Sequence, residues 1–153
     1  MERIKVDVVL LYQDVVLPEY QTERSAGQDV RAYLNKDKYP DGKIELRDKA
    51  QRIIPTGLKL AIPDGYELQV RPRSGLSFKT KLRIANSPGT VDGDYRDEVG
   101  IIVENIGEEV IVINHGDRIA QFVYAPIVHA DYNVKDKLDE TTRKGGFGST
   151  GLT

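Results

Sequence analysis

Apolar and polar residues alternate in short runs along most of this chain of 153 residues. Near the N-terminus, Ile4, Val6 and Val8 alternate with Lys5 and Asp7, which is the period-two pattern of a half-buried strand. Further short apolar runs occupy residues 53–54, 57–62, 66–70, 99–103, 110–113 and 118–125. Many short strands separated by turns predict an all-β barrel or sandwich.

The segments between these runs are rich in turn-forming residues, at 40–42, 63–65, 87–89, 106–107 and 115–117. No window longer than about 11 residues shows a strong period of 3.6, and one short helix is predicted to begin near Ser74. Residues 34–52 are polar and charged, which predicts a solvent-exposed excursion with a hairpin around Asp41-Gly42. Residues 1–132 are predicted to form a single β domain, and residues 133–153, which carry few apolar groups, a flexible C-terminal arm.

The composition narrows the class of protein. There is no cysteine, which excludes a disulfide framework and a cysteine nucleophile and fits a reducing cytosol. The 22 basic and 24 acidic residues give a net charge of −2, whereas a bulk binder of nucleic acid has a basic excess. No apolar run approaches a membrane span, and the charged N-terminus is unlike a signal peptide. We therefore expect a cytoplasmic protein that binds neither nucleic acid nor membranes.

The segment Arg71-Pro72-Arg73-Ser74-Gly75 is a candidate anion site. Pro72 biases the residue before it away from helix, so Ser74 is predicted to be the N-cap of the short helix that follows. An arginine, a hydroxyl and a glycine amide at a helix N-terminus attract anions. A capped helix with two solvated arginines fits the same residues equally well.

Residues 84–96 are a candidate for base recognition and for proton transfer. Asp92 follows small and β-branched residues, which places it at a strand end, where a carboxylate can orient a water as general base. Asn86 offers a donor and an acceptor, matching the imide edge of a pyrimidine, and Tyr95 is suited to lie against a sugar. A plain Asp-Gly turn with solvated charges is the commoner interpretation of such a segment taken alone.

Two further segments carry isolated polar residues among apolar ones. In residues 116–122, Ile119 and Phe122 do not share one face of a regular strand, which predicts either a bulge or partial burial on both sides. Gln121 faces a ligand phosphate or, as is commoner, solvent or an interface. In residues 25–32, Asp29 stands beside Val30 and is expected to be partly buried. A buried carboxylate needs a partner, either an arginine or a metal-bound water.

The glycine-rich end of the chain, residues 143–151, holds a single aromatic residue, Phe147. Glycine-rich backbone brings amide groups close to phosphates, and an aromatic ring stacks on a base, so the segment suits a lid over a nucleotide. A plain disordered tail is the commoner interpretation of such an end.

Together, these segments resemble the five motifs of the trimeric dUTP pyrophosphatases (dUTPases), and they occur in the same order. The matching stretches are residues 26–32, 72–76, 89–96, 116–121 and 145–151, with Asn86 six residues before Asp92. The resemblance implies a jelly-roll-like β-barrel with one short helix and a flexible arm, assembled as a homotrimer with active sites shared between subunits. It implies Mg²⁺-dependent hydrolysis of dUTP to dUMP and pyrophosphate, which limits uracil incorporation into DNA and supplies dUMP for dTMP synthesis.

The resemblance also implies a role for each site residue. Asp92 is expected to orient the water that attacks the α-phosphorus, Tyr95 to pack on the deoxyribose, and Asp29 to support Mg²⁺ through its water ligands. The residues expected to contact uracil are Asn86, Gly89, Thr90 and Val91, and those expected to hold the phosphates are Arg73, Ser74, Gly75 and Gln121. The residues expected to close the site from the arm are Arg143, Phe147, Gly148 and Ser149.

The chain departs from the family pattern at two places. Asp97 stands where the family usually has glycine. Arg143 lies four residues before Phe147, where the family usually has five, and Lys144 is an alternative contact for the terminal phosphate.

Two rival functions fit the same fold. A dCTP deaminase, or a bifunctional deaminase–dUTPase, needs a glutamate beside the pyrimidine, and Glu98 is the only one near the third motif. A non-catalytic nucleotide-sensing module needs neither Asp92 nor the arm.

Overall fold

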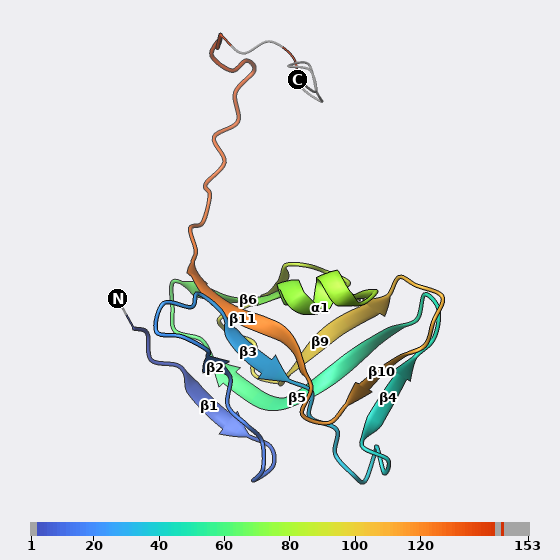
Figure 1. The fold of residues 1–153 in the computed structure, drawn as a ribbon. Coiled ribbons are helices and arrows are strands. Elements are labelled where there is room, and N and C mark those ends of the chain that lie inside the picture. The colour runs from blue at the N-terminus through green and yellow to red at the C-terminus, as the bar shows by residue number, and fades with distance from the viewer. Residues whose placement is uncertain (1–2, 143–144, 146–153) are drawn as a thin grey trace.

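The computed structural model describes residues 3–142 and residue 145 of the chain. In that part the elements, in chain order, are β1 (Asp7–Leu10), β2 (Glu19–Tyr20), β3 (Gln28–Arg31), β4 (Lys43–Leu46), β5 (Gln51–Ala61), β6 (Tyr66–Arg71), α1 (Ser74–Lys79), β7 (Leu82–Ile84), β8 (Gly89–Val91), β9 (Glu98–Asn105), β10 (Ile111–Asn114) and β11 (Arg118–Pro126). The predicted all-β class with one short helix is confirmed (Figure 1).

The strands form three antiparallel sheets. The larger two have the strand orders β1-β5-β9-β7 and β2-β3-β11-β6-β8, and β10 pairs with β4 in the third. Buried apolar residues from all three sheets make one core, in which Leu68 of β6, Ile101 of β9 and Phe122 of β11 are fully covered. Because the core is shared, the strands that carry the candidate site are held rigidly by packing.

The alternation in the sequence corresponds to the two faces of the strands. Along β9, Val99, Ile101, Val103 and Asn105 are buried, and the residues between them are partly covered. β9 pairs with β5 on one side and β7 on the other, so it lies in the interior of its sheet. This arrangement leaves its second face to form part of a pocket, described below.

Two expectations from the sequence are wrong. The first strand begins only at Asp7, and all four residues of β1 are exposed, although β1 does pair with β5. Ile4 and Val6, which are partly buried as the alternation predicts, precede it. The stretch 34–52 is not a solvated hairpin around Asp41-Gly42: β4 lies within it and pairs with β10, and Leu34, Ile44 and Leu46 are buried. The apolar residues of β4 alternate with Lys43 and Glu45, and so short a run is hidden by the charges around it.

After β11 the chain leaves the sheets, and residues 127–142 form neither helix nor strand (Figure 1). The division into a domain of residues 1–132 and an arm of residues 133–153 stays a prediction. Within the residues that the structure describes, no helix combines the length and the apolar character needed to cross a membrane.

Candidate active site

The predicted site residues of the described part fall into two pockets that share no lining residue. One has a volume of about 180 Å³ and is lined by Val70, Asn86, Gly89, Thr90, Val91, Asp92, Tyr95, Val99, Gly100 and Ile102; we call it the hairpin pocket. The other has a volume of about 360 Å³ and is lined by Gln21, Ser25, Ala26, Gly27, Asp29, Arg73, Ser74, Gly75 and Gln121; we call it the arginine pocket. Arg143, Phe147, Gly148 and Ser149, together with Lys144, lie outside the described residues.

The hairpin pocket is built around β8, which pairs with β6 so that Gly89 lies opposite Val70. Asp92 follows the last residue of β8 directly, so its predicted position at a strand end is confirmed, and the residue is exposed. Tyr95 is fixed at both ends: its amide donates to the Asp92 carbonyl at 3.2 Å, and its hydroxyl donates to the Glu98 carbonyl at 3.0 Å. These contacts place a carboxylate and an aromatic ring on the wall of one pocket.

Gly89 allows the Asn86 amide to lie against β8. A Cβ at position 89 would stand 3.1 Å from the Asn86 Nδ2 atom and 3.3 Å from the Val70 Cβ, which is tighter than ordinary contact. The glycine is therefore required by the approach of the amide rather than by an unusual backbone angle.

Four apolar wall residues of the hairpin pocket, Val70, Val99, Gly100 and Ile102, were not identified from the sequence. They belong to β6 and β9, whose patterns are those of ordinary strands, so no local signal distinguishes them. Apolar walls with a few convergent polar groups are typical of small-molecule sites.

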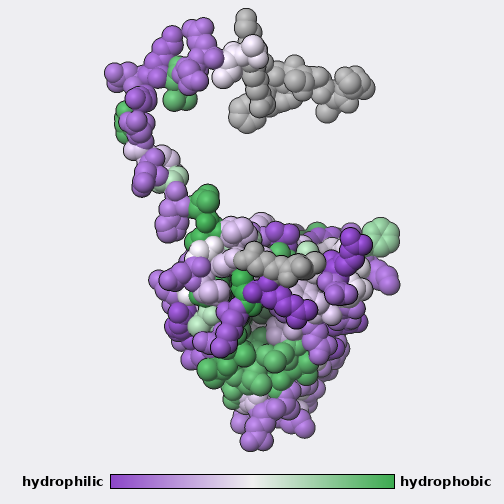
Figure 2. Space-filling view, turned by 90° about the vertical axis from the view of Figure 1, so that its left-hand side faces the viewer, coloured by the Kyte–Doolittle hydropathy of each residue, from purple (hydrophilic) through white to green (hydrophobic). Residues whose placement is uncertain are grey.

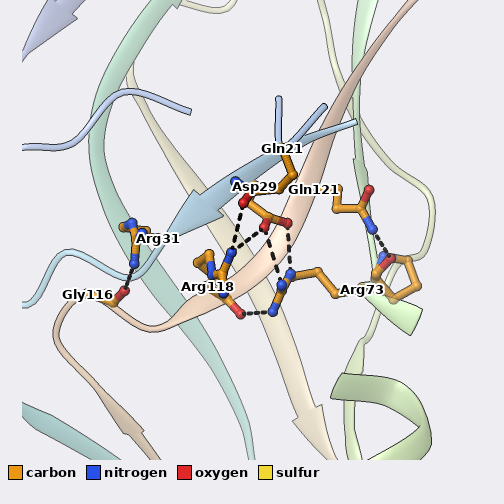
Figure 3. Close-up of polar contacts among 8 residues, drawn as sticks. Gln21, Asp29, Arg31, Arg73, Gly116, Arg118 and Gln121 are labelled. Carbon is orange, nitrogen blue, oxygen red and sulfur yellow. Dashed lines mark hydrogen bonds and ion pairs between the residues drawn. The ribbon is translucent and has the colours of Figure 1, made fainter. Parts of the chain in front are cut away.

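The arginine pocket contains a largely buried carboxylate, that of Asp29, which lies between two guanidinium groups, one of them (Arg73) on the pocket wall (Figure 3). The Asp29 side chain is 9 % exposed. Arg73 donates from Nε to Oδ1 at 2.8 Å and from Nη2 to Oδ2 at 3.2 Å, and Arg118 donates from Nη1 to Oδ2 at 3.1 Å. Arg73 Nη1 also donates to the backbone carbonyl of Arg118 at 3.1 Å. The partner that a buried Asp29 needs is thus a pair of arginines, and the second of them, Arg118, was not assigned a role from the sequence.

A bulge in β11 sets the geometry of this pocket. β11 pairs with β3 such that Arg118 lies opposite Arg31, but Ala120 lies opposite Val30, which leaves Ile119 as the extra residue. The predicted bulge is confirmed, and it gives two consecutive buried residues, at 119 and 120.

The start of α1 differs from the prediction. The N-cap is Arg73, with no side-chain capping hydrogen bond, and Ser74 is the first helical residue, so its predicted capping role is wrong. Arg73 is extended, and its side chain is occupied by Asp29. The Ser74 hydroxyl is therefore not committed to capping α1.

Gln121 lies across Gly27 and connects three segments of the chain. Its Nε2 donates to the Pro72 carbonyl at 3.4 Å, and a Cβ at position 27 would collide with its Oε1 atom. The glycine of the first motif, the proline of the second and the glutamine of the fourth are therefore packed as a unit.

The described residues contain no group of three or more His, Cys, Asp or Glu side chains arranged to hold a metal ion. An ionised carboxylate has about four acceptor positions, and Asp29 uses three of them on Arg73 and Arg118. The remaining position fits a water molecule of a hydrated cation, whereas direct ligation is disfavoured because two guanidinium groups already neutralise the charge. The donor set is thus compatible with an indirect, water-mediated role for Asp29.

The fold and the site define an antiparallel β protein with an apolar-walled pocket and a separate cationic pocket. A dUTPase family model matches residues 13–151. The chain therefore belongs to the dUTPase family, as the five motifs predicted.

Relatives and solved structures agree with this assignment. The deoxyuridine 5'-triphosphate nucleotidohydrolase of Roseobacter denitrificans is 51% identical over 138 residues, covering 90% of this chain and 88% of the relative. The same enzyme of Syntrophotalea carbinolica is 46% identical over 153 residues, covering 99% of this chain and 100% of the relative. The G164S mutant of the dUTPase of Staphylococcus bacteriophage 80alpha, solved with dUpNHpp, has a TM-score of 0.81 at 25% identity, and the match covers 97% of this chain and 99% of that chain. The predicted dUTPase-like fold is confirmed.

Proposed function

We propose that this protein is a dUTP diphosphatase, which hydrolyses dUTP to dUMP and pyrophosphate. The observation that carries the proposal is the sorting of the family motifs into two chemically different pockets. One has apolar walls, an amide and a carboxylate, which suit a base, a sugar and a bound water. The other is lined by Arg73 and Asp29, and Arg118 behind Asp29 makes the net charge of the three groups positive, which suits phosphates.

In the hairpin pocket, uracil is recognised by Asn86 and by the backbone of Gly89, Thr90 and Val91. Hydrogen bonds that the wrong base leaves unpaired give strong selectivity, whereas apolar fit alone gives little. The ring of Tyr95 packs on the deoxyribose, supported by the hydrogen bond of its hydroxyl to Glu98.

Asp92 acts as the general base. Its exposed carboxylate takes a proton from the attacking water, whose oxygen forms a bond to the α-phosphorus while the bond to the bridging oxygen of pyrophosphate breaks. A positioned general base contributes on the order of 10²–10⁴ in rate. The proposal rests on the position of Asp92 at the end of β8, on the wall of the same pocket as Asn86 and Tyr95.

In the arginine pocket, the phosphates are held by Arg73, Ser74, Gly75 and Gln121. Asp29 would hold Mg²⁺ indirectly, by accepting a hydrogen bond from one of the water ligands of the ion. The chemistry that Mg²⁺ would supply there is neutralisation of negative charge on the triphosphate. A mutant dUTPase of phage phi11, which has the same fold at 24% identity and a TM-score of 0.74, is described with a coordinated structural Mg(II) ion.

The complete site is assembled from several copies of the chain in a homotrimer. Because the two pockets of one chain share no residue, each is proposed to join the complementary pocket of a neighbouring copy. The arm of residues 133–153 then covers this composite active site through Arg143, Phe147, Gly148 and Ser149. Figure 2 shows an exposed apolar patch on the side of the molecule where β1 lies. The exposed apolar residues of β1 itself are Val8, Val9 and Leu10. A surface of this kind favours burial against another subunit.

The experiment that tests the function is a comparison of dUTP, dCTP, dTTP and UTP, each with and without Mg²⁺, with pyrophosphate, ammonia and the product base as readouts. We expect pyrophosphate and dUMP from dUTP alone. Ammonia from dCTP would favour the deaminase, and binding without turnover would favour a sensing module. Light scattering is expected to give a mass close to three chains.

A further inference from the structure

We propose that Arg118 is a positioning residue, which fixes Arg73 for phosphate binding by holding Asp29 and by accepting a hydrogen bond from Arg73 itself. The inference rests on the proposed function of the arginine pocket. Arg118 does not line that pocket, whereas Arg73 and Asp29 do. Its influence on a ligand must therefore pass through those two side chains or through Gln21, which also lines the pocket and accepts a hydrogen bond from Arg118 Nη1 at 3.3 Å.

The contacts form a closed ring. The Arg118 side chain donates to Asp29 Oδ2, both oxygens of Asp29 accept from Arg73, and Arg73 Nη1 donates back to the Arg118 carbonyl. Figure 3 shows the three side chains converging from β3, β11 and the segment before α1. Arg118 thus holds the Arg73 guanidinium group directly through its backbone carbonyl and indirectly, by way of Asp29, through its side chain.

The bulge at Ile119 makes this arrangement possible. In a regular strand, Arg118 and Gln121 would point to opposite faces because they are three residues apart. The extra residue brings both to the face of Asp29, which lies opposite Gln121 in the register. Bulges near sites commonly re-aim a side chain in this way.

The consequence concerns how much of Arg73 is available to a ligand. Three of its five N–H groups are used, by Asp29 twice and by the Arg118 carbonyl once, so two remain. With Arg118 in place, the cluster of Asp29, Arg73 and Arg118 carries a net charge of +1 and its geometry is fixed. Without Arg118, the buried carboxylate would be neutralised by Arg73 alone, the net charge would fall to zero, and less attraction would remain for phosphate.

The first test is the variant Arg118→Gln, with binding measured by calorimetry for α,β-imido-dUTP and by NMR titration for deoxyuridine. We expect the triphosphate analogue to bind on the order of 10- to 100-fold more weakly, the range of a hydrogen bond to a charged group. Deoxyuridine affinity is expected to change by less than about threefold, since the hairpin pocket shares no residue with the cluster. Equal weakening of both ligands would show a general structural effect and would overturn the inference.

The matched control is Arg31→Gln. Arg31 lies directly opposite Arg118 in the register and donates to the Gly116 carbonyl at 2.8 Å, so the variant removes the same charge from a neighbouring position outside both pockets. We expect wild-type affinity for the triphosphate analogue. An equal loss in both variants would mean that only net charge matters, and the positioning role would be rejected.

A double-mutant cycle with Asp29→Asn separates action through Asp29 from direct contact with the ligand. In that background Arg118 has no carboxylate to hold, so Arg118→Gln is expected to change the affinity by less than about threefold. Additive losses would place Arg118 on the phosphates and sink the positioning role. If Arg118→Gln does not fold, Arg118→Lys takes its place in the same cycle. The smaller loss of affinity for the triphosphate analogue that we expect from Arg118→Lys must then be absent in the Asp29→Asn background.

The wild-type protein separates this inference from the proposed function. If it binds no α,β-imido-dUTP, the dUTPase proposal fails first. If it binds the analogue and Arg118→Gln binds equally well, only the role of Arg118 is refuted.

Discussion

The hairpin pocket and the arginine pocket are built in different ways. Apart from Val70, the hairpin pocket comes from one stretch of chain, residues 86–102, and its polar groups are exposed. The arginine pocket joins segments far apart in sequence: Asp29 pairs with Arg73, 44 residues away, and with Arg118, 89 residues away. Its central carboxylate is almost completely covered.

This difference predicts which substitutions affect catalysis alone and which also affect the stability of the fold. A polar group on an exposed turn can be exchanged without uncovering a charge, so changes in the hairpin pocket should alter turnover and leave the fold intact. A buried carboxylate depends on its partners, and removing one of them leaves an uncompensated charge. Changes in the arginine pocket should therefore alter both ligand binding and the free energy of unfolding.

The largest expected effect is that of Asp92→Asn in the hairpin pocket. The amide keeps the shape of the side chain but accepts no proton, so kcat for pyrophosphate release should fall by a factor on the order of 10²–10⁴. The free energy of unfolding in urea should stay within about 0.5 kcal/mol, because the residue is exposed. Wild-type kcat in this variant would refute the assignment of the base.

Arg73→Lys should affect both binding and stability. A lysine cannot reproduce the two parallel hydrogen bonds to Asp29, so we expect a loss of about 1–3 kcal/mol in unfolding free energy and weaker binding of a triphosphate analogue. The control is Lys59→Ala, which removes an exposed pair with Asp97 at 3.7 Å and should cost less than about 1 kcal/mol. Equal costs in urea titrations would show that burial of Asp29 does not matter.

The same contrast explains which parts of the fold were predictable from the sequence. The period-two pattern identified β9, whose eight residues alternate in burial over its whole length. It failed for β4, where only Ile44 and Leu46 mark the buried face among charges. It was right about the partial burial of Ile4 and Val6 but wrong about the strand, which begins at Asp7 and is exposed along its whole length.

For the site, residues close together in sequence could be grouped, and residues paired across the fold could not. Asp92 and Tyr95 were assigned to one site from a single turn. The partner of Asp29 was left open between arginine and a metal-bound water, since the choice depends on the register of β3 with β11. Ile119 and Phe122 did predict the bulge, but its effect on Arg118 becomes visible only when the strands are paired.

Gly27→Ala tests the packing that links the segments of the arginine pocket. The new Cβ would collide with the Gln121 side chain, so we expect a loss of about 1 kcal/mol in stability and a higher KM for dUTP. The comparison variant is Gly75→Ala, where a Cβ meets nothing within 4 Å and the residue is helical. Its stability should rise by about 0.5–1 kcal/mol. A stable Gly27→Ala protein with unchanged KM would show that Gln121 is free to move away.

Outside both pockets, Asp14 and Tyr33 form an exposed counterpart of the buried Asp29 pair. The Tyr33 hydroxyl donates to Asp14 Oδ1 at 2.6 Å, which raises the pKa of Tyr33 to about 12 and lowers the pKa of Asp14 below its usual value. Through Asp14, the hydrogen bond stabilises the folded state at pH values above the pKa that Asp14 has in the unfolded chain. This stabilisation is lost as the pH falls through the lower pKa that Asp14 has in the folded protein. For Tyr33, it is present below the unfolded pKa of about 10 and is lost as the pH rises through about 12.

The smallest expected effect is therefore that of Asp14→Asn on the alkaline titration. Phenolate absorbance of the wild type should show two tyrosines that titrate late, Tyr33 and Tyr124, the latter because burial raises its pKa to about 12. In Asp14→Asn one of these should return toward about 10, since the carboxylate that holds the hydroxyl is gone. Tyr124 should be unaffected and serves as the internal reference. If both tyrosines still titrate late, the hydrogen bond to Asp14 does not control the pKa of Tyr33. The exposed contact between Asp14 and Tyr33 would then contribute little, in contrast to the covered ion pairs of Asp29.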